Sequence, residues 1–258
     1  YINAAQFRQF CNSVVPLARL PRFTYSNNEE VTAAIELYQY GPADMNNTIL
    51  DWKLTDQNGN IIQSGSTPAK NYSRGNLHEV GSLRFELRGI SAPQELQLIV
   101  SVKGTVFRNQ WSIWVYPASL PMVELTDLPD RLETDTLDEK AIAILNNGGK
   151  VILNLYGKVT KGREVVQAFT PVFWNTSWFK MRPPHTLGLL IDSASAAFRF
   201  FPTASHSDLQ WWEVVTHSQV MHLEDFSPAM PVLIRPIDTW FMNRNLGLAF
   251  EARIGKGR

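Results

Sequence analysis

The sequence is poor in the features that mark several common classes of protein. Its single cysteine, Cys11, excludes an internal disulfide and a zinc site built on cysteines. No apolar run approaches the roughly 20 residues of a membrane-spanning helix, so we expect no membrane partner. Lysine and arginine together number 24, as do aspartate and glutamate, and the basic residues are scattered along the chain. We therefore expect no nucleic-acid partner, because phosphate binding needs basic residues gathered on one surface.

The motifs of common catalytic sites are also missing. The chain has no G-x-S-x-G elbow, no phosphate loop, no G-x-G-x-x-G after a strand and no H-E-x-x-H. Gly148 and Gly149 follow a predicted helix and precede a predicted strand, which is the order of a helix stop. Acidic residues gather between Glu124 and Glu139, in a linker and at a helix start, where carboxylates meet the helix dipole favourably. We expect no catalytic residue, no cofactor and no metal in this chain.

A short helix is predicted over residues 3–15 of the 258-residue chain. Asn3 and Gln6 match a capping box. The apolar stripe consists of Phe7, Phe10, Cys11 and Val14. Because a helix of this length is marginal in water, its stripe needs a partner surface, either the following domain or a preceding one. We favour the preceding one and interpret residues 1–16 as a helical linker from a catalytic domain outside this chain.

Residues 17–118 are predicted to form an antiparallel β-sandwich. They contain short β-rich runs and no long helical pattern, as two facing sheets require. The predicted strands are 32–40, 49–55, 60–64, 83–87, 96–102 and 110–115. Gln57-Asn58-Gly59 joins the second strand to the third and is a strong hairpin signal.

Residues 119–258 are predicted to form an α/β domain after a linker at 116–121. Thr136 to Glu139 match a capping box for a helix ending at Asn147. Residues 150–155 follow as an almost continuous apolar strand, which is typical of a parallel strand covered on both faces. Met122 to Leu125 is the candidate strand before that helix. Further strands are expected at 187–191, 232–234 and 246–250, with helical turns at 194–201 and 208–215.

Aromatic and histidine residues are densest between Phe173 and Trp212. A carbohydrate site pairs flat rings with a few oriented polar groups, because sugars present apolar C–H faces ringed by hydroxyls. The predicted carbohydrate-contact residues are Trp174, His185, His206, Asp208, Gln210 and Trp211. The two histidines have no acidic neighbour at a metal-binding spacing.

The same cluster can also be interpreted as core. Ser207 to Gln210 form a capping box, and Leu209, Trp212 and Val215 fall on one face of the predicted helix 208–215. Trp211 lies about 100° around that helix from Trp212. We therefore predict Trp211 as the ligand contact and Trp212 as the core residue.

Several stretches resemble one family. RFTYSNNEEVTAAIELYQYG, ILDWKLTDQNGNIIQSG and FRNQWSIWVYP resemble the immunoglobulin-like domain of bacterial glycoside hydrolase family 2 proteins. PVFWNTSWF, HTLGLLIDSASAAFRFFPTASHSDLQWWEVV and IDTWFMNRNLGLAFEARIGKGR resemble the C-terminal region of the same multidomain proteins, which are described as sugar-binding-domain or β-galactosidase-like proteins. The second domain also resembles the flavodoxin-like, glutamine-amidotransferase-like domain of other β-galactosidases. Amidotransferase activity is not implied, because Cys11 lies in the wrong domain.

The resemblance implies a two-domain, non-catalytic segment: an all-β immunoglobulin-like sandwich over 17–118 and an α/β flavodoxin-like domain over 119–258. The family's two catalytic glutamates lie on a TIM barrel, whose eightfold pattern is absent from this chain. An upstream barrel of the same polypeptide is therefore the expected partner, in the periplasm or outside a bacterial cell. The expected function is that of an accessory segment of a β-glycosidase. An autonomous carbohydrate-binding module that binds an oligosaccharide, and a structural segment that forms a homo-oligomer, are the alternatives.

Overall fold

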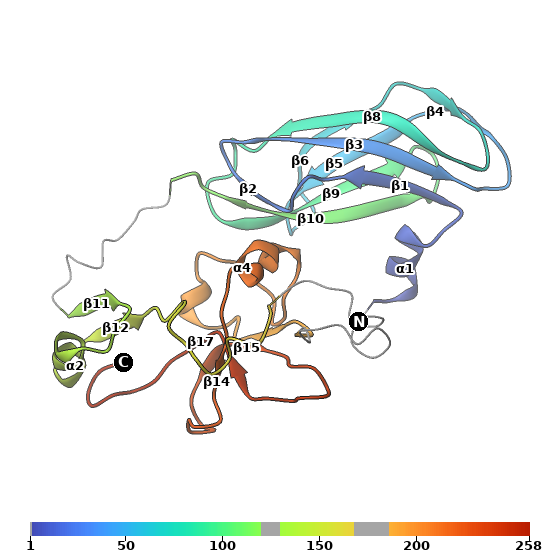
Figure 1. The fold of residues 1–258 in the computed structure, drawn as a ribbon. Helices are drawn as coiled ribbons and strands as arrows, with labels where there is room; N and C mark the ends of the chain where they lie inside the picture. The colour runs from blue at the N-terminus through green and yellow to red at the C-terminus, as the bar shows by residue number, and fades with distance from the viewer. Residues whose placement is uncertain (1, 120–129, 168–185) are drawn as a thin grey trace. The chain divides into compact units, whose positions relative to one another are not determined.

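The chain folds into two units in a computed structural model that describes residues 2–119, 130–167 and 186–258 (Figure 1). One unit comprises Tyr1–Leu120 with Phe200–Pro202, and the other comprises Pro121–Arg199 with Thr203–Arg258.

The N-terminal unit is built from two facing β-sheets (Figure 1). The antiparallel three-stranded sheet has the order β1 (Val14–Arg19), β3 (Glu30–Gln39), β8 (Asn76–Glu86). The five-stranded sheet has the order β2 (Thr24–Ser26), β10 (Arg108–Tyr116), β9 (Gln94–Val102), β5 (Leu50–Thr55), β6 (Ile61–Ser66). Its strands are antiparallel except for β2, which runs parallel to β10. β4 (Met45–Thr48) and β7 (Lys70–Tyr72) form a separate pair.

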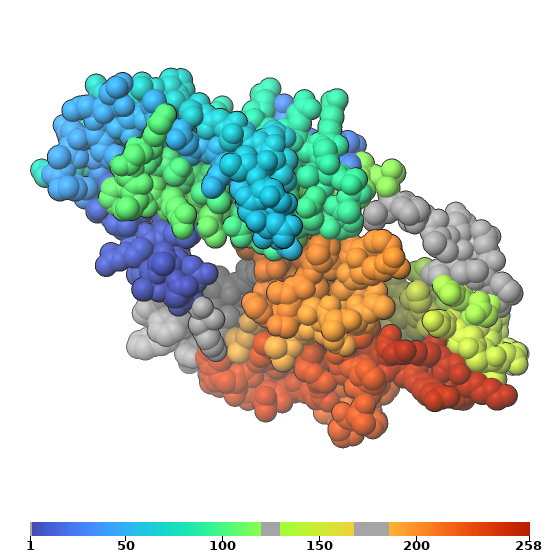
Figure 2. Space-filling model, turned by 180° about the vertical axis from the view of Figure 1, so that it is seen from behind, coloured from blue at the N-terminus to red at the C-terminus, as the bar shows by residue number. Residues whose placement is uncertain are grey.

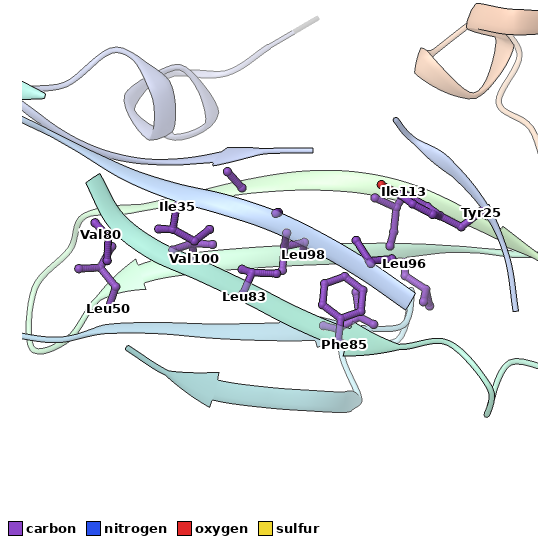
Figure 3. Packing of buried hydrophobic residues seen from close by; sticks show 14 of the residues in the cluster. Tyr25, Ile35, Leu50, Val80, Leu83, Phe85, Leu96, Leu98, Val100 and Ile113 are labelled. Atoms are coloured by element: carbon purple, nitrogen blue, oxygen red, sulfur yellow. The ribbon is translucent and has the colours of Figure 1, made fainter. Parts of the chain in front are cut away.

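One hydrophobic core joins the two sheets. Alternate residues of β3 and β9 are buried, so that each strand turns one face inward and the other outward. Ile35 from β3, Phe85 from β8 and Leu98 from β9 point toward the same interior (Figure 3). The alternation in the sequence thus correctly predicted a β-rich domain here.

The predicted hairpin between β5 and β6 is confirmed. Gly59 has a positive φ of 83°, which glycine adopts without strain. The Asp56 carboxylate accepts hydrogen bonds from the backbone N–H groups of Asn58 and Asn60, at 2.9 and 2.8 Å. This turn fixes the register in which Asp51 opposes Ser66.

The predicted N-terminal helix is shorter than expected. α1 (Ala4–Phe10) has the Asn3–Gln6 capping box, but Val14, predicted as the end of its stripe, begins β1 instead. The sequence favours an extended chain there because Pro16 disfavours the helical conformation in the residue before it. The helix buries none of its residues, and its two phenylalanines are 46 and 54% exposed.

The C-terminal unit begins with a parallel strand pair joined by a helix: β11 (Arg131–Thr134), α2 (Glu139–Asn146) and β12 (Lys150–Leu153). The predicted helix is confirmed, but its N-cap is Asp138 and not Thr136. The Asp138 carboxylate accepts a hydrogen bond from the backbone N–H of Ala141 at 2.9 Å. The predicted strand at 122–125 lies outside the described residues.

The remaining elements of this unit are short. β13 (Leu189–Ile191), β15 (Val232–Pro236) and β17 (Ala249–Phe250) form an antiparallel sheet, and β14 (Met221–His222) pairs with β16 (Leu246–Gly247). The short helices are η2 (Ala196–Phe198), η3 (Leu209–Trp211) and α4 (Trp212–Thr216). None of the helices in the described parts of the chain is long and apolar enough to cross a membrane.

The expected flavodoxin-like sheet is not found in the described residues. β11 and β12 are their only parallel pair in this unit, and the other strands run antiparallel. The apolar run of β12 suggested a strand covered on both faces, yet Ile152 is 53% exposed and Leu153 is 37% exposed. An apolar run alone does not distinguish a buried parallel strand from a short strand with one side open.

Candidate functional site

The structure describes four of the six predicted carbohydrate-contact residues. Trp174 and His185 lie outside the described residues. His206 is exposed and forms an isolated bridge with Leu190. Asp208 is the N-cap of η3 and accepts a hydrogen bond from the backbone N–H of Gln210 at 3.0 Å. Gln210 itself is buried. A sugar contact by His206, Asp208 or Gln210 stays a prediction.

The exposure predicted for the two adjacent tryptophans is reversed. Trp211 is 2% exposed, whereas Trp212 is 47% exposed. The Trp211 indole N–H donates to the Thr203 hydroxyl oxygen at 2.9 Å, and its ring meets Phe198 edge-on with centroids 6.2 Å apart. Trp211 is therefore a core residue of this unit, and the proposal that its ring stacks on a sugar is withdrawn.

A different group of aromatic residues is presented to solvent by the loop between β15 and β16, residues 237–245. Trp240, Phe241 and Met242 follow one another in sequence and are 54, 60 and 54% exposed. The two rings lie with their centroids 5.4 Å apart and their planes inclined by 41°. Large apolar side chains gathered at the surface mark a contact site more often than scattered ones do. We call these three residues the aromatic tip.

A buried ion pair closes the base of the loop that carries the aromatic tip. The Asp238 side chain is 2% exposed, and that of Arg244 is 12% exposed. Arg244 donates through Nε to Asp238 Oδ2 at 2.7 Å and through Nη2 to Oδ1 at 3.0 Å, in the bidentate geometry of strong guanidinium–carboxylate pairs. The backbone N–H groups of Thr239 and Arg244 donate to the same carboxylate at 2.8 and 2.9 Å.

These donors set the charge state of Asp238. Burial disfavours the ionised form of Asp238 and by itself raises its pKa. The hydrogen bonds from the Arg244 side chain and from the two backbone amides, together with the positive charge of Arg244, outweigh burial. The pKa of Asp238 therefore lies below its ordinary value. The hydrogen bond to Asp238 raises the pKa of Arg244. Both groups are charged at neutral pH, so the loop base is closed by a full ion pair.

The turn above this base is also fixed by hydrogen bonds. The backbone N–H groups of Met242 and Asn243 both donate to the carbonyl of Thr239, at 3.2 and 2.9 Å. Asn243 has a positive φ of 48°, a conformation that asparagine tolerates better than most residues. The aromatic tip is therefore presented in a conformation that the backbone and the ion pair define beforehand.

Further charged groups extend outward from Arg244. Its Nη1 lies 3.1 Å from Glu164 Oε1, which lies 2.9 Å from His222 Nε2, and His222 Nδ1 lies 3.6 Å from Glu224 Oε2. The pKa of Glu164 is lowered, chiefly because its carboxylate accepts a hydrogen bond from its own backbone amide. Burial opposes this shift, and a hydrogen bond from the amide of Gly162 adds to it. A general acid needs a raised pKa, so this network fits a clamp on the loop better than an acid–base site. The described residues contain no cluster of three or more acidic, histidine or cysteine side chains that could hold a metal.

The sequence contained a signal for this loop that pattern analysis missed. In Asp238-Thr-Trp-Phe-Met-Asn-Arg244, three large apolar residues stand between an acid and a base, with an asparagine at the turn. The stretch has neither the period of a strand nor that of a helix, and only the flanking charges and the asparagine indicate a loop.

Several solved structures resemble part of this chain, at low TM-scores. An alkylpurine DNA glycosylase from Pseudomonas fluorescens is 13% identical with a TM-score of 0.33, and covers 40% of this chain and 30% of its own. A β-glucuronidase from glycoside hydrolase family 2 is 10% identical with a TM-score of 0.29, and the match covers 40% of this chain and 11% of the glucuronidase. The β-glucuronidase of Parabacteroides merdae is 14% identical with a TM-score of 0.27, and the match covers 40% of this chain and 13% of that enzyme. The chain thus spans less than a third of the length of each of these proteins.

Family models match both units. No curated protein matches the chain. Residues 29–117, within the β-sandwich, match the model described as Domain of unknown function (DUF8488). Residues 132–258, which carry the aromatic tip, match the model described as Domain of unknown function (DUF8487).

Proposed function

We propose that this chain is a non-catalytic, carbohydrate-binding part of a larger carbohydrate-degrading protein, and that Trp240 and Phe241 contact the sugar. The observation that carries the proposal is the exposure of both rings on a loop fixed by Asp238 and Arg244. Aromatic faces bind the apolar C–H faces of pyranose rings, and rings held in place beforehand lose little conformational entropy on binding.

The parent protein is proposed to be a β-glycosidase of the glycoside hydrolase family 2 type, exported to the periplasm or beyond. The support is the sequence resemblance, together with a sandwich in which β1-β3-β8 faces β2-β10-β9-β5-β6, an arrangement compatible with an immunoglobulin-like domain. An upstream TIM barrel of the same polypeptide is the proposed partner. The chain would support that barrel and add a sugar contact near it.

Removal of the aromatic tip should weaken sugar binding without unfolding the chain. We expect Trp240→Ala and Phe241→Ala each to weaken binding of a neutral β-linked tetrasaccharide, β-1,4-galactotetraose or cellotetraose, by about ten-fold, equivalent to about 1.4 kcal/mol. Isothermal titration calorimetry measures the Kd. Both residues are exposed, so the melting temperature should change little.

Trp212→Ala is the matched control, because it removes another partly exposed tryptophan from the same unit. It should leave the Kd unchanged. The proposal is wrong if neither tetrasaccharide binds at millimolar concentration. It is also wrong if Trp240→Ala converts an oligomer into a monomer in light scattering while sugar binding persists, because the tip would then be a subunit contact.

The isolated chain should hydrolyse no aryl β-glycoside. A retaining or inverting glycosidase needs two carboxylates on either side of the scissile bond, one of them with a raised pKa. In the described residues the pKa of Glu164 and that of Asp238 are both shifted downward. Release of 4-nitrophenol from its β-galactoside and β-glucuronide measures turnover. Turnover above the buffer blank that disappears in Glu164→Gln would contradict the prediction.

A further inference from the structure

A shallow pocket of about 310 Å³ lies on the five-stranded sheet of the N-terminal unit, over β5, β6 and the end of β9. The β5–β6 hairpin, in light blue and cyan, lies at the surface of this unit in the space-filling view (Figure 2). The pocket's polar lining comprises Asp51, Lys53, Ser64, Ser66, Ser101 and Lys103. The pocket lies in the N-terminal unit, whereas the aromatic tip lies in the C-terminal unit.

The register of the sheet places the polar lining on one face. Asp51 opposes Ser66 on β6 and Ser101 on β9, and Lys53 opposes Ser64. Leu50 and Leu54 of β5, with side chains on the opposite face, are fully buried in the core. Side chains that alternate with core residues point away from the core, so these polar groups share the outward face.

The two lysines bracket the row of hydroxyls. Lys53 is two residues from Asp51 along β5, and Lys103 is two residues beyond Ser101, which opposes Asp51. At about 3.3 Å per residue, their backbone positions are separated by roughly 13 Å along the strands. The two lysines thus leave the backbone on either side of Asp51 and Ser101 along the strands.

Neither lysine is neutralised within the described chain. No ion pair or side-chain hydrogen bond joins Lys53 or Lys103 to any residue that the structure describes. The Asp51 carboxylate accepts a hydrogen bond from the Ser66 hydroxyl at 2.6 Å, and the Ser101 hydroxyl donates to the Asp51 carbonyl at 3.4 Å. The lining carries two positive formal charges and one negative, an excess that favours an anion.

The floor of the pocket is packed against the core through Trp52. Gly65, between the two serines of β6, allows the Trp52 ring to lie against the strand, because a Cβ there would stand 2.7 Å from Trp52 Nε1. Trp52 in turn packs on Phe85 with ring centroids 5.8 Å apart, at the edge of the core. The hydroxyls of Ser64 and Ser66 are therefore carried by a strand that the core holds in place.

We propose that this pocket binds an acidic sugar, a pyranose chain that bears carboxylate or sulfate groups. The ammonium groups of Lys53 and Lys103 bind the anionic substituents, and the serine hydroxyls and Asp51 bind the ring hydroxyls. The lysine ammonium group is a compact positive charge that binds a carboxylate and a sulfate alike. Both kinds of acidic sugar present the same feature to it, an oxyanion on a hydroxylated ring.

The test is calorimetric titration of the full chain with tetragalacturonate, with its fully methyl-esterified form, and with a sulfated galactan tetrasaccharide. We expect the wild type to bind at least one acidic tetrasaccharide at least ten-fold more tightly than the uncharged ester. The double variant Lys53→Met/Lys103→Met should lose at least ten-fold of that affinity, and binding should weaken as salt rises. The preference between the carboxylated and sulfated probes identifies the anion.

Lys140→Met is the matched control, since it removes an exposed lysine from α2 in the other unit. It should change neither the Kd nor the salt dependence. Trp240→Ala should also leave the affinity for the acidic probe unchanged, which separates this site from the aromatic tip. Equal binding of the ester, unchanged affinity in the double variant, or absence of binding would overturn the proposal. Displacement of tetragalacturonate by an equal concentration of inorganic sulfate would overturn the assignment to a sugar.

Discussion

Replacement of Trp211 by alanine is expected to destabilise the C-terminal unit by about 3 to 5 kcal/mol, the usual range for truncation of a buried aromatic side chain. The ring is 2% exposed, and its loss also leaves the Thr203 hydroxyl without the indole donor. Trp212→Ala, one position along the chain, is expected to cost under about 1 kcal/mol, because that ring is 47% exposed.

Urea and thermal unfolding of the full chain measure both effects, in the transition assigned to the C-terminal unit. Trp211→Phe is a useful intermediate, because it keeps one aromatic ring in the core while it removes the N–H donor and part of the indole's buried volume. Greater destabilisation by Trp212→Ala than by Trp211→Ala would contradict the structure and restore the helix phase that the sequence suggested.

The sandwich was the part of the fold most accessible from sequence. β3 and β9 each have one buried and one outward face, so their apolar residues alternate with polar ones along the chain. The Asn58-Gly59 turn then set the pairing of β5 with β6. β1 was missed because a helix stripe and a strand both accommodate Val14, although Pro16 disfavours a helical conformation at the residue before it.

The phase of the Trp211 helix could not be obtained from a uniform period of 3.6 residues. The chain begins this segment as a 3₁₀ turn, η3, and continues as α4. The 3₁₀ turn advances about 120° per residue, so the face counted from Leu209 is displaced before the α-helix starts. The buried face consequently contains Trp211 and Val215, four residues apart, and leaves Leu209 38% exposed.

The candidate site depends on contacts between distant segments, which a single sequence does not reveal. Glu164 lies 80 positions from Arg244, and the two meet only in the folded unit. The aromatic tip is different, because its residues are consecutive. Aromatic density alone favours the stretch upstream, in which Trp211 lies in the core and Trp212 lies at the surface.

Replacement of Arg244 by alanine is the second change with a large expected effect. Removal of one partner of a buried ion pair typically costs about 3 to 5 kcal/mol, because the other charge is left uncompensated. We expect a loss near 3 kcal/mol, since the amides of Thr239 and of residue 244 continue to bind the Asp238 carboxylate. Arg253→Ala, at an exposed arginine near the chain end, should change stability by less than about 0.5 kcal/mol.

The same ion pair predicts how the Arg244→Ala effect depends on pH. The pKa of Asp238 in the folded chain lies below its ordinary value of 3.8, so the folded state binds this proton less readily than the unfolded state does. The stabilisation is therefore complete above pH 3.8 and is lost as the pH falls through the lower, folded value. The difference in unfolding free energy between wild type and Arg244→Ala should be largest at neutral pH and shrink as the pH falls toward and below 3.8. A difference that is the same at every pH would show that Arg244 stabilises the loop through packing of its side chain and not through the charge of Asp238.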